Sequence, residues 1–139
     1  MLDLGRTFLQ SAERSPGALA VVDGDARLSY SQWALRIGSV QKALADLGVR
    51  RGDHLLSALQ NRLEAATLHW ACQFSGIVIT PVNWRAKADE IEYCMEDSGA
   101  RVLVFESVMQ EAIAAARLPE GVITIGVGEV RDAAVSFGD

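Results

Sequence analysis

The 139-residue sequence contains only two cysteines and two histidines. Cys72 and Cys94 both lie in apolar stretches with helical spacing, so we expect buried free thiols rather than a disulfide framework or a metal site. His54 and His69 have no Ser or Cys partner at a spacing typical of nucleophilic catalysis, and with the scattered acids they match no metal pattern. We therefore predict that this chain carries no catalytic residue and no metal ligand.

Long apolar runs are also missing. No run approaches the roughly 18 to 20 residues that a helix needs to cross a bilayer. The N-terminus lacks the charged-then-apolar pattern of a secretion signal and carries an early acid, Asp3. The sequence therefore predicts a cytoplasmic protein without a membrane span.

Positive charge is sparse and dispersed. The net charge is −5, and the 13 Lys and Arg residues are scattered along the chain. A phosphate-tracking stripe of basic residues is absent, so we expect no nucleic-acid partner.

Glycine-rich phosphate loops are absent as well. Neither G-x-x-x-x-G-K-[ST] nor G-x-G-x-x-G occurs. The nearest approach, at residues 126–128, lacks a third glycine and a following lysine. It is therefore interpreted as a plain loop.

What the sequence does have is a regular alternation of helices and strands. A short amphipathic helix reaching Arg14 precedes a hairpin, whose expected strands, 18–22 and 27–30, are joined by a turn at Asp23-Gly24. The clearest helix begins after Ser29, because Gln32 stands three residues later as in a capping box, and it ends at Gly48. Its apolar face is expected to contain Trp33, Ile37, Val40, Leu44 and Leu47.

Beyond residue 53 the alternation continues to residue 125. We expect strands at 54–59, 77–80, 102–105 and 122–125, and helices at 62–74, 87–95 and 107–117. The runs 77–80 and 102–105 have the composition of strands buried on both faces. The fold class predicted is α/β, a doubly wound, mostly parallel sheet flanked by helices, with a short N-terminal β-hairpin. Residues 1–128 are expected to form one subdomain around one core, and residues 129–139 a connector.

One segment stands out as a candidate site. Pro81 ends a predicted strand, Asn83 can fix a turn, and Arg85 then follows at the carboxyl end of that strand, where parallel sheets bind ligands. Anion binding by Arg85 and a structural salt bridge both remain open. The acids at 90, 92, 96 and 97 are interpreted as a solvated helix face.

The order of these segments resembles the start of the AMP-forming acyl-CoA synthetases, the superfamily that also contains peptide-synthetase adenylation domains and luciferases. The resemblance spans roughly residues 4 to 128 and depends on several ordered motifs. They are Leu28–Trp33, Ala43–Asp53 (A-L-x-x-L-G-V-x-x-G-D), Leu59-Gln60-Asn61, Trp70–Gly76, Pro81–Arg85 (P-x-N-x-R), and Glu90, Tyr93, Asp97, Ser98, Ala100 and Val102.

The resemblance implies a ligase that activates a small carboxylic acid, in fatty or aromatic acid metabolism, with ATP and Mg²⁺ and then transfers it to CoA. In that family the phosphate loop ending in Pro-Lys-Gly, the adenine and ribose motifs and a lysine on a mobile C-terminal domain come later than this segment. Neither Lys42 nor Lys87 stands in a matching motif. The resemblance therefore implies an N-terminal portion of the large domain that is inactive alone, with Arg85 near the CoA phosphates.

The partners implied are the remainder of the large domain and the C-terminal domain, with a homo-oligomer left open. Two alternatives also remain open. The chain could be a free-standing, non-catalytic α/β binding or interaction domain, or part of a peptide-synthetase adenylation module.

Overall fold

The computed structural model describes residues 3–137, and the chain divides into two compact units. The first unit consists of Met1–Arg50 and Asn61–Gly76, and the second of Arg51–Gln60 and Ile77–Asp139. One cluster of buried side chains lies inside each unit. Hydrophobic spacing locates each buried face without revealing which faces pack together, so it does not predict this division.

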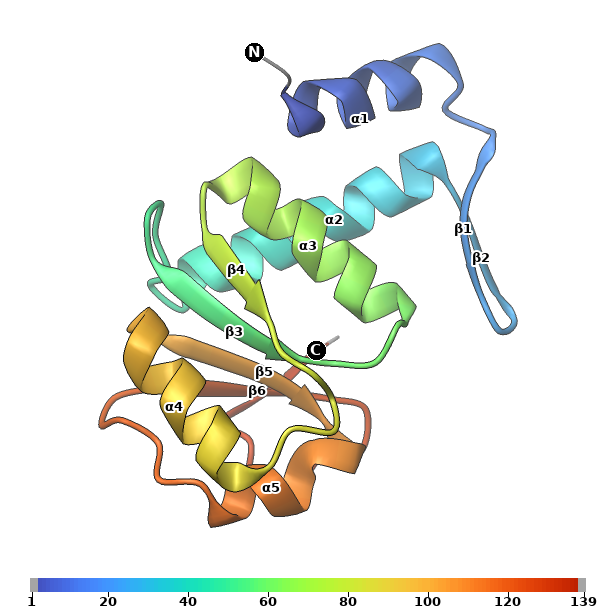
Figure 1. Ribbon diagram of the computed structural model, residues 1–139. Coiled ribbons are helices and arrows are strands. Elements are labelled where there is room, and N and C mark those ends of the chain that lie inside the picture. The colour runs from blue at the N-terminus through green and yellow to red at the C-terminus, as the bar shows by residue number, and fades with distance from the viewer. Residues whose placement is uncertain (1–2, 138–139) are drawn as a thin grey trace. The chain divides into compact units, whose positions relative to one another are not determined.

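The first unit contains three helices and a β-hairpin (Figure 1). Its elements are α1 (Leu4–Arg14), β1 (Leu19–Asp23), β2 (Ala26–Ser29), α2 (Tyr30–Asp46) and α3 (Leu63–Ser75). The hairpin is antiparallel, and Gly24 in its turn has φ +55°, a conformation that glycine adopts without steric cost. The predicted hairpin is confirmed to within one residue at each strand end.

Both ends of α2 follow the predicted signals. The Gln32 N–H donates to the Ser29 hydroxyl at 3.3 Å, and the Gln32 side chain accepts the Ser29 N–H at 2.9 Å. This capping box satisfies two backbone donors. At the other end Gly48 has φ +81°, and the Val49 N–H donates to the Leu44 carbonyl at 3.0 Å.

The core of the first unit is centred on aromatic side chains. Phe8 of α1 lies 5.5 Å from Trp33, centroid to centroid, and 4.9 Å from Trp70. The Trp33 indole N–H donates to the Thr67 hydroxyl at 3.0 Å, which satisfies a donor that is buried in this core. Helices α1, α2 and α3 are joined through these contacts.

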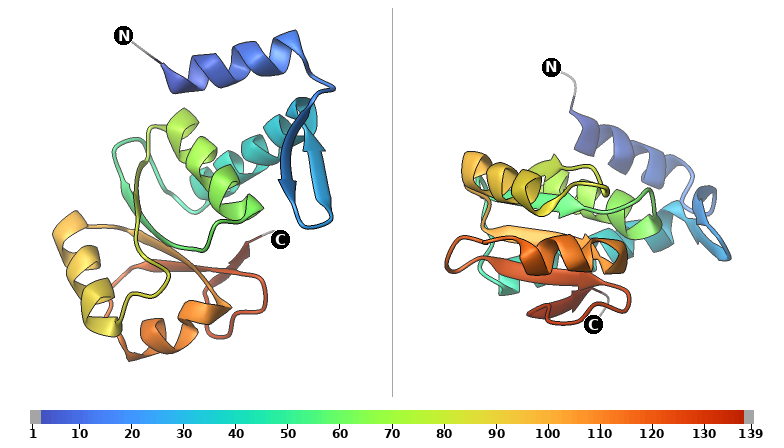
Figure 2. Two further views of the ribbon diagram at one scale, coloured as in Figure 1. Left: turned by 45° about the vertical axis from the view of Figure 1, so that its right-hand side comes forward. Right: turned by 60° about the horizontal axis from the view of Figure 1, so that its bottom comes forward.

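The second unit is a five-stranded parallel sheet with the strand order β4-β3-β5-β6-β7 (Figure 2). Its elements are β3 (His54–Ala58), β4 (Val78–Pro81), α4 (Ala88–Ser98), β5 (Val102–Glu106), the 3₁₀ turn η1 (Ser107–Met109), α5 (Gln110–Ala115), β6 (Ile123–Val127) and β7 (Val135–Phe137). Every neighbouring pair of strands is parallel. The predicted α/β class, with a parallel sheet flanked by helices, is confirmed.

Helices α4 and α5 pack on the sheet of this unit. Ile91 and Met95 of α4 and Ile113 of α5 form one cluster with Leu56 of β3 and Leu103 of β5. All residues of β5 are buried, as the sequence predicts for a strand covered on both faces. Among the described residues, no helix combines the length and the apolar character needed to cross a membrane.

Two predictions for this unit are wrong. Strand β4 is not buried on both faces: it lies at an edge of the sheet, and Val78 is 44% exposed. The stretch predicted as a connector contains β7, which extends the sheet on the other side. Val135 pairs with Ile125, and the Ala134 N–H donates to the Thr124 hydroxyl at 3.0 Å. A strand of three residues is too short to produce a recognisable hydrophobic period.

Candidate functional site

Four parallel strands of the second unit end at the same edge of the sheet. β4 ends at Pro81, β3 at Ala58, β5 at Glu106 and β6 at Val127. In open α/β sheets the crevice beyond the carboxyl ends is where ligands bind. The loops that follow these strands are therefore the candidate functional site.

The loop after β4 is fixed by two hydrogen bonds from its own residues. The Asn83 side-chain oxygen accepts the Arg85 N–H at 2.9 Å, and the Asn83 carbonyl accepts the Ala86 N–H at 2.9 Å. The Val82 N–H donates to the Ser57 carbonyl at 2.9 Å and attaches the loop to β3. The predicted turn at Asn83 is present, and it aims the following side chains.

Arg85 lies on an aromatic platform. Its guanidinium carbon is 4.3 Å from the centroid of the Trp84 ring, which is cation–π distance. Trp84 is half-buried and packs against the α4 and β5 core, whereas Arg85 is exposed. The ring therefore connects the cation to the rigid part of the unit.

The salt-bridge alternative for Arg85 does not occur in this structure: within residues 3–137, no carboxylate is at ion-pair distance from it. An exposed guanidinium on a ring keeps its outer N–H donors available to an oxyanion. Sequence reasoning identified Arg85 but missed the role of Trp84, although the two are adjacent and follow a turn residue.

A buried acid at the same edge was also missed. Glu106, the last residue of β5, is 6% exposed, and its carboxylate accepts the Gln60 N–H. This contact fixes the chain just after β3, beside the end of β5. The sequence signal that could have identified Glu106 is its position directly after the four apolar residues 102–105.

Strand β6 contains a glycine, Gly126, whose presence has a structural reason. A Cβ at Gly126 would lie 2.7 Å from the Val130 Cβ, closer than side chains pack. Gly126 therefore permits the close approach of the following segment. This packing accounts for Gly126 without a phosphate. The interpretation of residues 126–128 as a plain loop is wrong for Gly126 and Val127, which lie in β6 and pair with β5, and only Gly128 follows the strand.

The remaining polar candidates have structural surroundings. His54 begins β3, and its buried Nδ1 has no hydrogen-bond partner among the described residues. His69 lies edge-on to Trp70 with the ring centroids 5.6 Å apart. Burial raises the pKa of the Cys72 thiol to about 12, so this cysteine stays protonated and unreactive.

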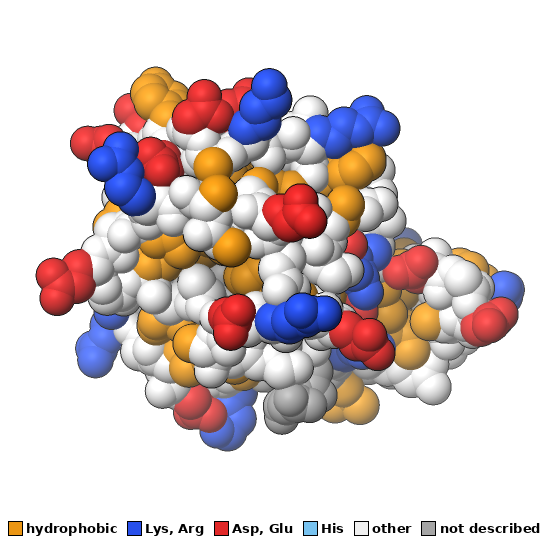
Figure 3. Space-filling view, turned by 90° about the horizontal axis from the view of Figure 1, so that it is seen from below, with side chains coloured by type: hydrophobic (Ala, Val, Ile, Leu, Met, Phe, Trp, Pro, Cys, Tyr) orange, Lys and Arg blue, Asp and Glu red, His pale blue; other side chains and the backbone are white. Residues whose placement is uncertain are grey.

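The carboxylates of α4 likewise have local partners. Glu90 accepts the Lys87 N–H at 2.8 Å, and Glu92 accepts the Arg117 N–H at 2.7 Å. Within the described residues, no three His, Cys, Asp or Glu side chains converge to hold a metal ion. On the face shown in Figure 3, Lys and Arg side chains alternate with Asp and Glu rather than forming a stripe of one sign.

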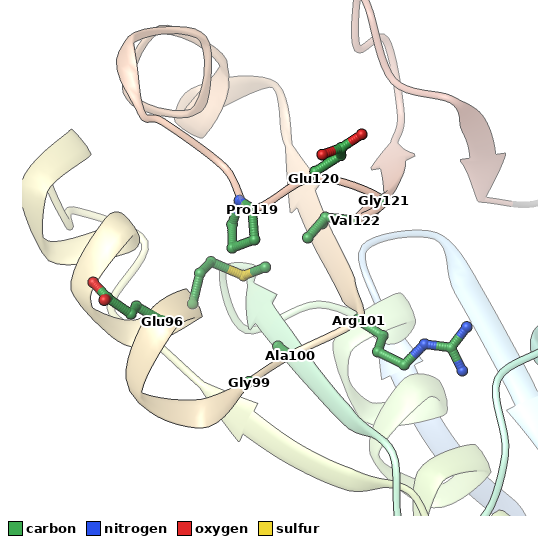
Figure 4. Close-up of a pocket in the computed structure, with 9 residues that line it drawn as sticks. Glu96, Gly99, Ala100, Arg101, Pro119, Glu120, Gly121 and Val122 are labelled. Atoms are coloured by element: carbon green, nitrogen blue, oxygen red, sulfur yellow. The ribbon is translucent and has the colours of Figure 1, made fainter.

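A cavity of about 420 Å³ lies away from this edge, between the end of α4 and the segment before β6 (Figure 4). Glu96, Arg101 and Glu120 contribute to its lining, but in Figure 4 their charged ends point away from the space beside Pro119. The cavity is at the amino ends of β5 and β6, opposite the edge where such sheets bind ligands. It is therefore not the candidate site.

Comparison with known proteins gives one family. The model of the family described as "AMP-binding enzyme" matches residues 8–136. Feruloyl-CoA synthase of an Amycolatopsis species is 30% identical over 98% of this chain, and the chain spans 29% of that protein. Malpibaldin synthetase of Mortierella alpina is 32% identical over 94% of this chain, which spans 2% of that protein.

A solved structure shows the same fold. The N-terminal domain of FACL13 from Mycobacterium tuberculosis superposes with a TM-score of 0.84 and 28% identity, covering 91% of this chain and 34% of that one. The chain thus spans about a third or less of the relatives it matches.

Proposed function

The chain belongs to the AMP-binding enzyme family, and from that premise we propose that it is the N-terminal portion of an ATP-dependent acyl- or aryl-CoA ligase. The observation that carries the proposal is the match over residues 8–136, together with the 30% identity to a feruloyl-CoA synthase. The parent would join a small carboxylic acid to ATP with release of pyrophosphate. The CoA thiol would then attack the acyl-adenylate, forming the thioester and releasing AMP.

The described residues do not fit Mg²⁺-ATP. Mg²⁺ binds carboxylate and phosphate oxygens, and no acidic cluster within residues 3–137 can hold it. Lys42 is paired with Asp46 at 2.6 Å, and Val130 occupies the space beside Gly126 of β6. We propose that the triphosphate and metal sites belong to the remainder of the parent, and that this segment is a structural wall of the large domain.

Arg85 is the residue that we assign to a ligand, the phosphates of CoA. Its support is the exposed guanidinium, the Trp84 platform and the position beyond β4. Bidentate hydrogen bonding to phosphate is the interaction that a guanidinium makes best.

The Arg85 assignment is tested in the full-length parent by separating its two half-reactions. Arg85→Ala should raise the KM for CoA about tenfold or more, the loss of roughly 1.5 kcal/mol of a charge-assisted contact, and leave ATP–pyrophosphate exchange unchanged. Arg27→Ala, which removes an exposed arginine of the β-hairpin, is the matched control and should change neither. An unaltered KM for CoA in Arg85→Ala would contradict the assignment.

The proposed division of labour is tested with the 139-residue chain itself. We expect no ATP–pyrophosphate exchange above background with aliphatic or aromatic acids, while circular dichroism shows a folded protein. We also expect the coding sequence after codon 139 to encode a Ser/Thr/Gly-rich loop ending in Pro-Lys-Gly. Exchange by the isolated chain would contradict the proposal.

Two other functions make different predictions for the same experiments. A non-catalytic binding domain would have a stop codon directly after codon 139. The match to malpibaldin synthetase supports a second alternative, a peptide-synthetase adenylation module. Such a module would be followed by a carrier-protein domain. In that case the parent would transfer its acyl group to the carrier, and Arg85→Ala would change no CoA-dependent step.

A further inference from the structure

An apolar groove of about 710 Å³ runs along the first unit between α1 and α2. Leu9 and Ala12 of α1 form one wall, and Ala34, Leu35 and Gly38 of α2 form the other. Leu35 is 75% exposed and Leu9 is 47% exposed. Apolar side chains gathered along a groove are typical of a contact surface, whereas single exposed ones are not.

The glycine in this groove is unexplained by the unit's own packing. Gly38 lies in the middle of the 17-residue helix α2, where glycine is destabilising relative to alanine. A Cβ at this position would meet, within 4 Å, no atom of the described chain beyond the neighbouring residues and the nearby backbone of α2 itself. Gly38 therefore leaves a hollow on the helix surface, one turn from the protruding Leu35.

The groove residues of α2 are complementary to a second copy of themselves. In an antiparallel pair of α2 helices related by a twofold axis between residues 36 and 37, Leu35 faces the partner's Gly38. The same axis places Ala34 opposite the partner's Ser39, and Ser31 opposite the partner's Lys42. Each copy thus presents a knob to the other's hollow, as an isologous interface requires.

The charges at the two ends of the groove agree with this arrangement. The Ser31 N–H donates to the Pro16 carbonyl at 3.0 Å, which places the end of α1, and with it Glu13, beside the start of α2. Lys42 lines the opposite end of the groove, where its ammonium group lies 2.6 Å from the Asp46 carboxylate of the same helix. The twofold axis brings each Lys42 to the partner's Glu13, and an N–H donor of the ammonium group that Asp46 does not use can bind this second carboxylate at both ends.

We propose that the α1–α2 groove is a homodimer interface, in which two α2 helices pack antiparallel with each Leu35 seated against the partner's Gly38. The interface lies within the first unit and is separate from Arg85. Its existence does not depend on the proposed ligase activity.

Sedimentation velocity of the 139-residue chain from about 1 µM to about 1 mM, the range of weak complexes, tests the proposal. We expect a concentration-dependent monomer–dimer equilibrium. Leu35→Glu places a charge in the contact, and Gly38→Gln fills the hollow, so each should weaken the dimer at least tenfold. Because Gly38→Gln also raises helix propensity, its melting temperature should not fall, which separates lost contact from lost folding.

The matched control is Leu19→Glu, which adds the same charge at a half-exposed leucine of β1 outside the groove and should leave the dimer intact. A charge exchange tests the geometry. Glu13→Lys and Lys42→Glu should each weaken the dimer, and the double variant should restore it.

A chain that stays monomeric throughout this range overturns the proposal and assigns the groove to a different occupant. A dimer that Leu35→Glu and Gly38→Gln leave unchanged overturns it equally.

Discussion

The buried hydrogen bond between Trp33 and Thr67 provides a sharp test of the first unit's core. Trp33 is 8% exposed and Thr67 fully buried, and the indole N–H donates to the Thr67 hydroxyl at 3.0 Å. The hydroxyl in turn donates to the Leu63 carbonyl at 2.7 Å. Thr67→Val keeps the shape of the side chain and removes the acceptor, so the indole N–H is left buried without a partner.

The magnitude follows from what each substitution leaves unpaired. Thr67→Val should lower the free energy of unfolding by about 1 to 3 kcal/mol, the cost of an orphaned buried donor. Trp33→Ala should cost roughly 3 to 5 kcal/mol, because it empties a site that also contacts Phe8. In the Trp33→Phe background there is no donor to orphan, so adding Thr67→Val should cost about 1 to 2 kcal/mol less than in the wild type.

Urea unfolding followed by far-ultraviolet circular dichroism measures all four members of this cycle, and the slope shows whether unfolding stays two-state. Thr67→Ser, which retains a hydroxyl, is the matched control. Additivity of the two substitutions within about 0.5 kcal/mol would mean that the hydrogen bond contributes nothing. A wild-type stability in Trp33→Ala would refute the assignment of this core.

Two further predictions concern ionisable groups. Burial raises the pKa of the Cys72 thiol to about 12, so a disulfide reagent should rapidly label only the half-buried Cys94. In the Cys94→Ser variant the remaining thiol, Cys72, should react only as fast as the protein unfolds. Rapid labelling of that variant would contradict the burial of Cys72. Burial alone would raise the pKa of Glu64, but the hydrogen bond and charge of Arg62, a backbone hydrogen bond and the charge of Arg36 together outweigh it and hold the pKa below 4.5. The stability that Glu64 contributes is therefore present above pH 4.5 and is lost as the pH falls below it. In Glu64→Gln, the urea midpoint plotted against pH should fall less steeply on the acid side. An identical plot would show that the Glu64–Arg62 pair adds nothing to stability.

Local signals explain why much of the fold can be predicted from the sequence. The ends of α2 depend on Ser29, Gln32 and Gly48, whose effects act within a few residues, and the structure reproduces all three. The run of apolar residues at 102–105 is typical of a strand buried on both faces, and β5 has that burial, whereas the similar run at 77–80 gives the edge strand β4. The family resemblance depended on the order of such local features.

Features that depend on pairing across the chain were not predictable. β7 exists because Val135–Phe137 finds a free edge beside β6, and β4 is exposed because it occupies the opposite edge. Neither position is encoded in the residues of the strand itself. At the candidate site, the position of Arg85 came from the turn at Asn83, whereas its seat on Trp84 required the side-chain geometry.

The discontinuous division of the chain has a consequence for how the protein is synthesised. Strand β3 belongs to the second unit, yet it lies in sequence between the two segments of the first. During translation the first unit is complete once Gly76 has emerged, whereas β5 emerges thirty residues later. β4 has emerged by Pro81 and can pair with one edge of β3, but until β5 emerges the other edge of β3 has no strand beside it. Unpaired strand edges of this kind favour aggregation, so we expect this edge of β3 to be open to aggregation while the chain between Gly76 and Glu106 is being made.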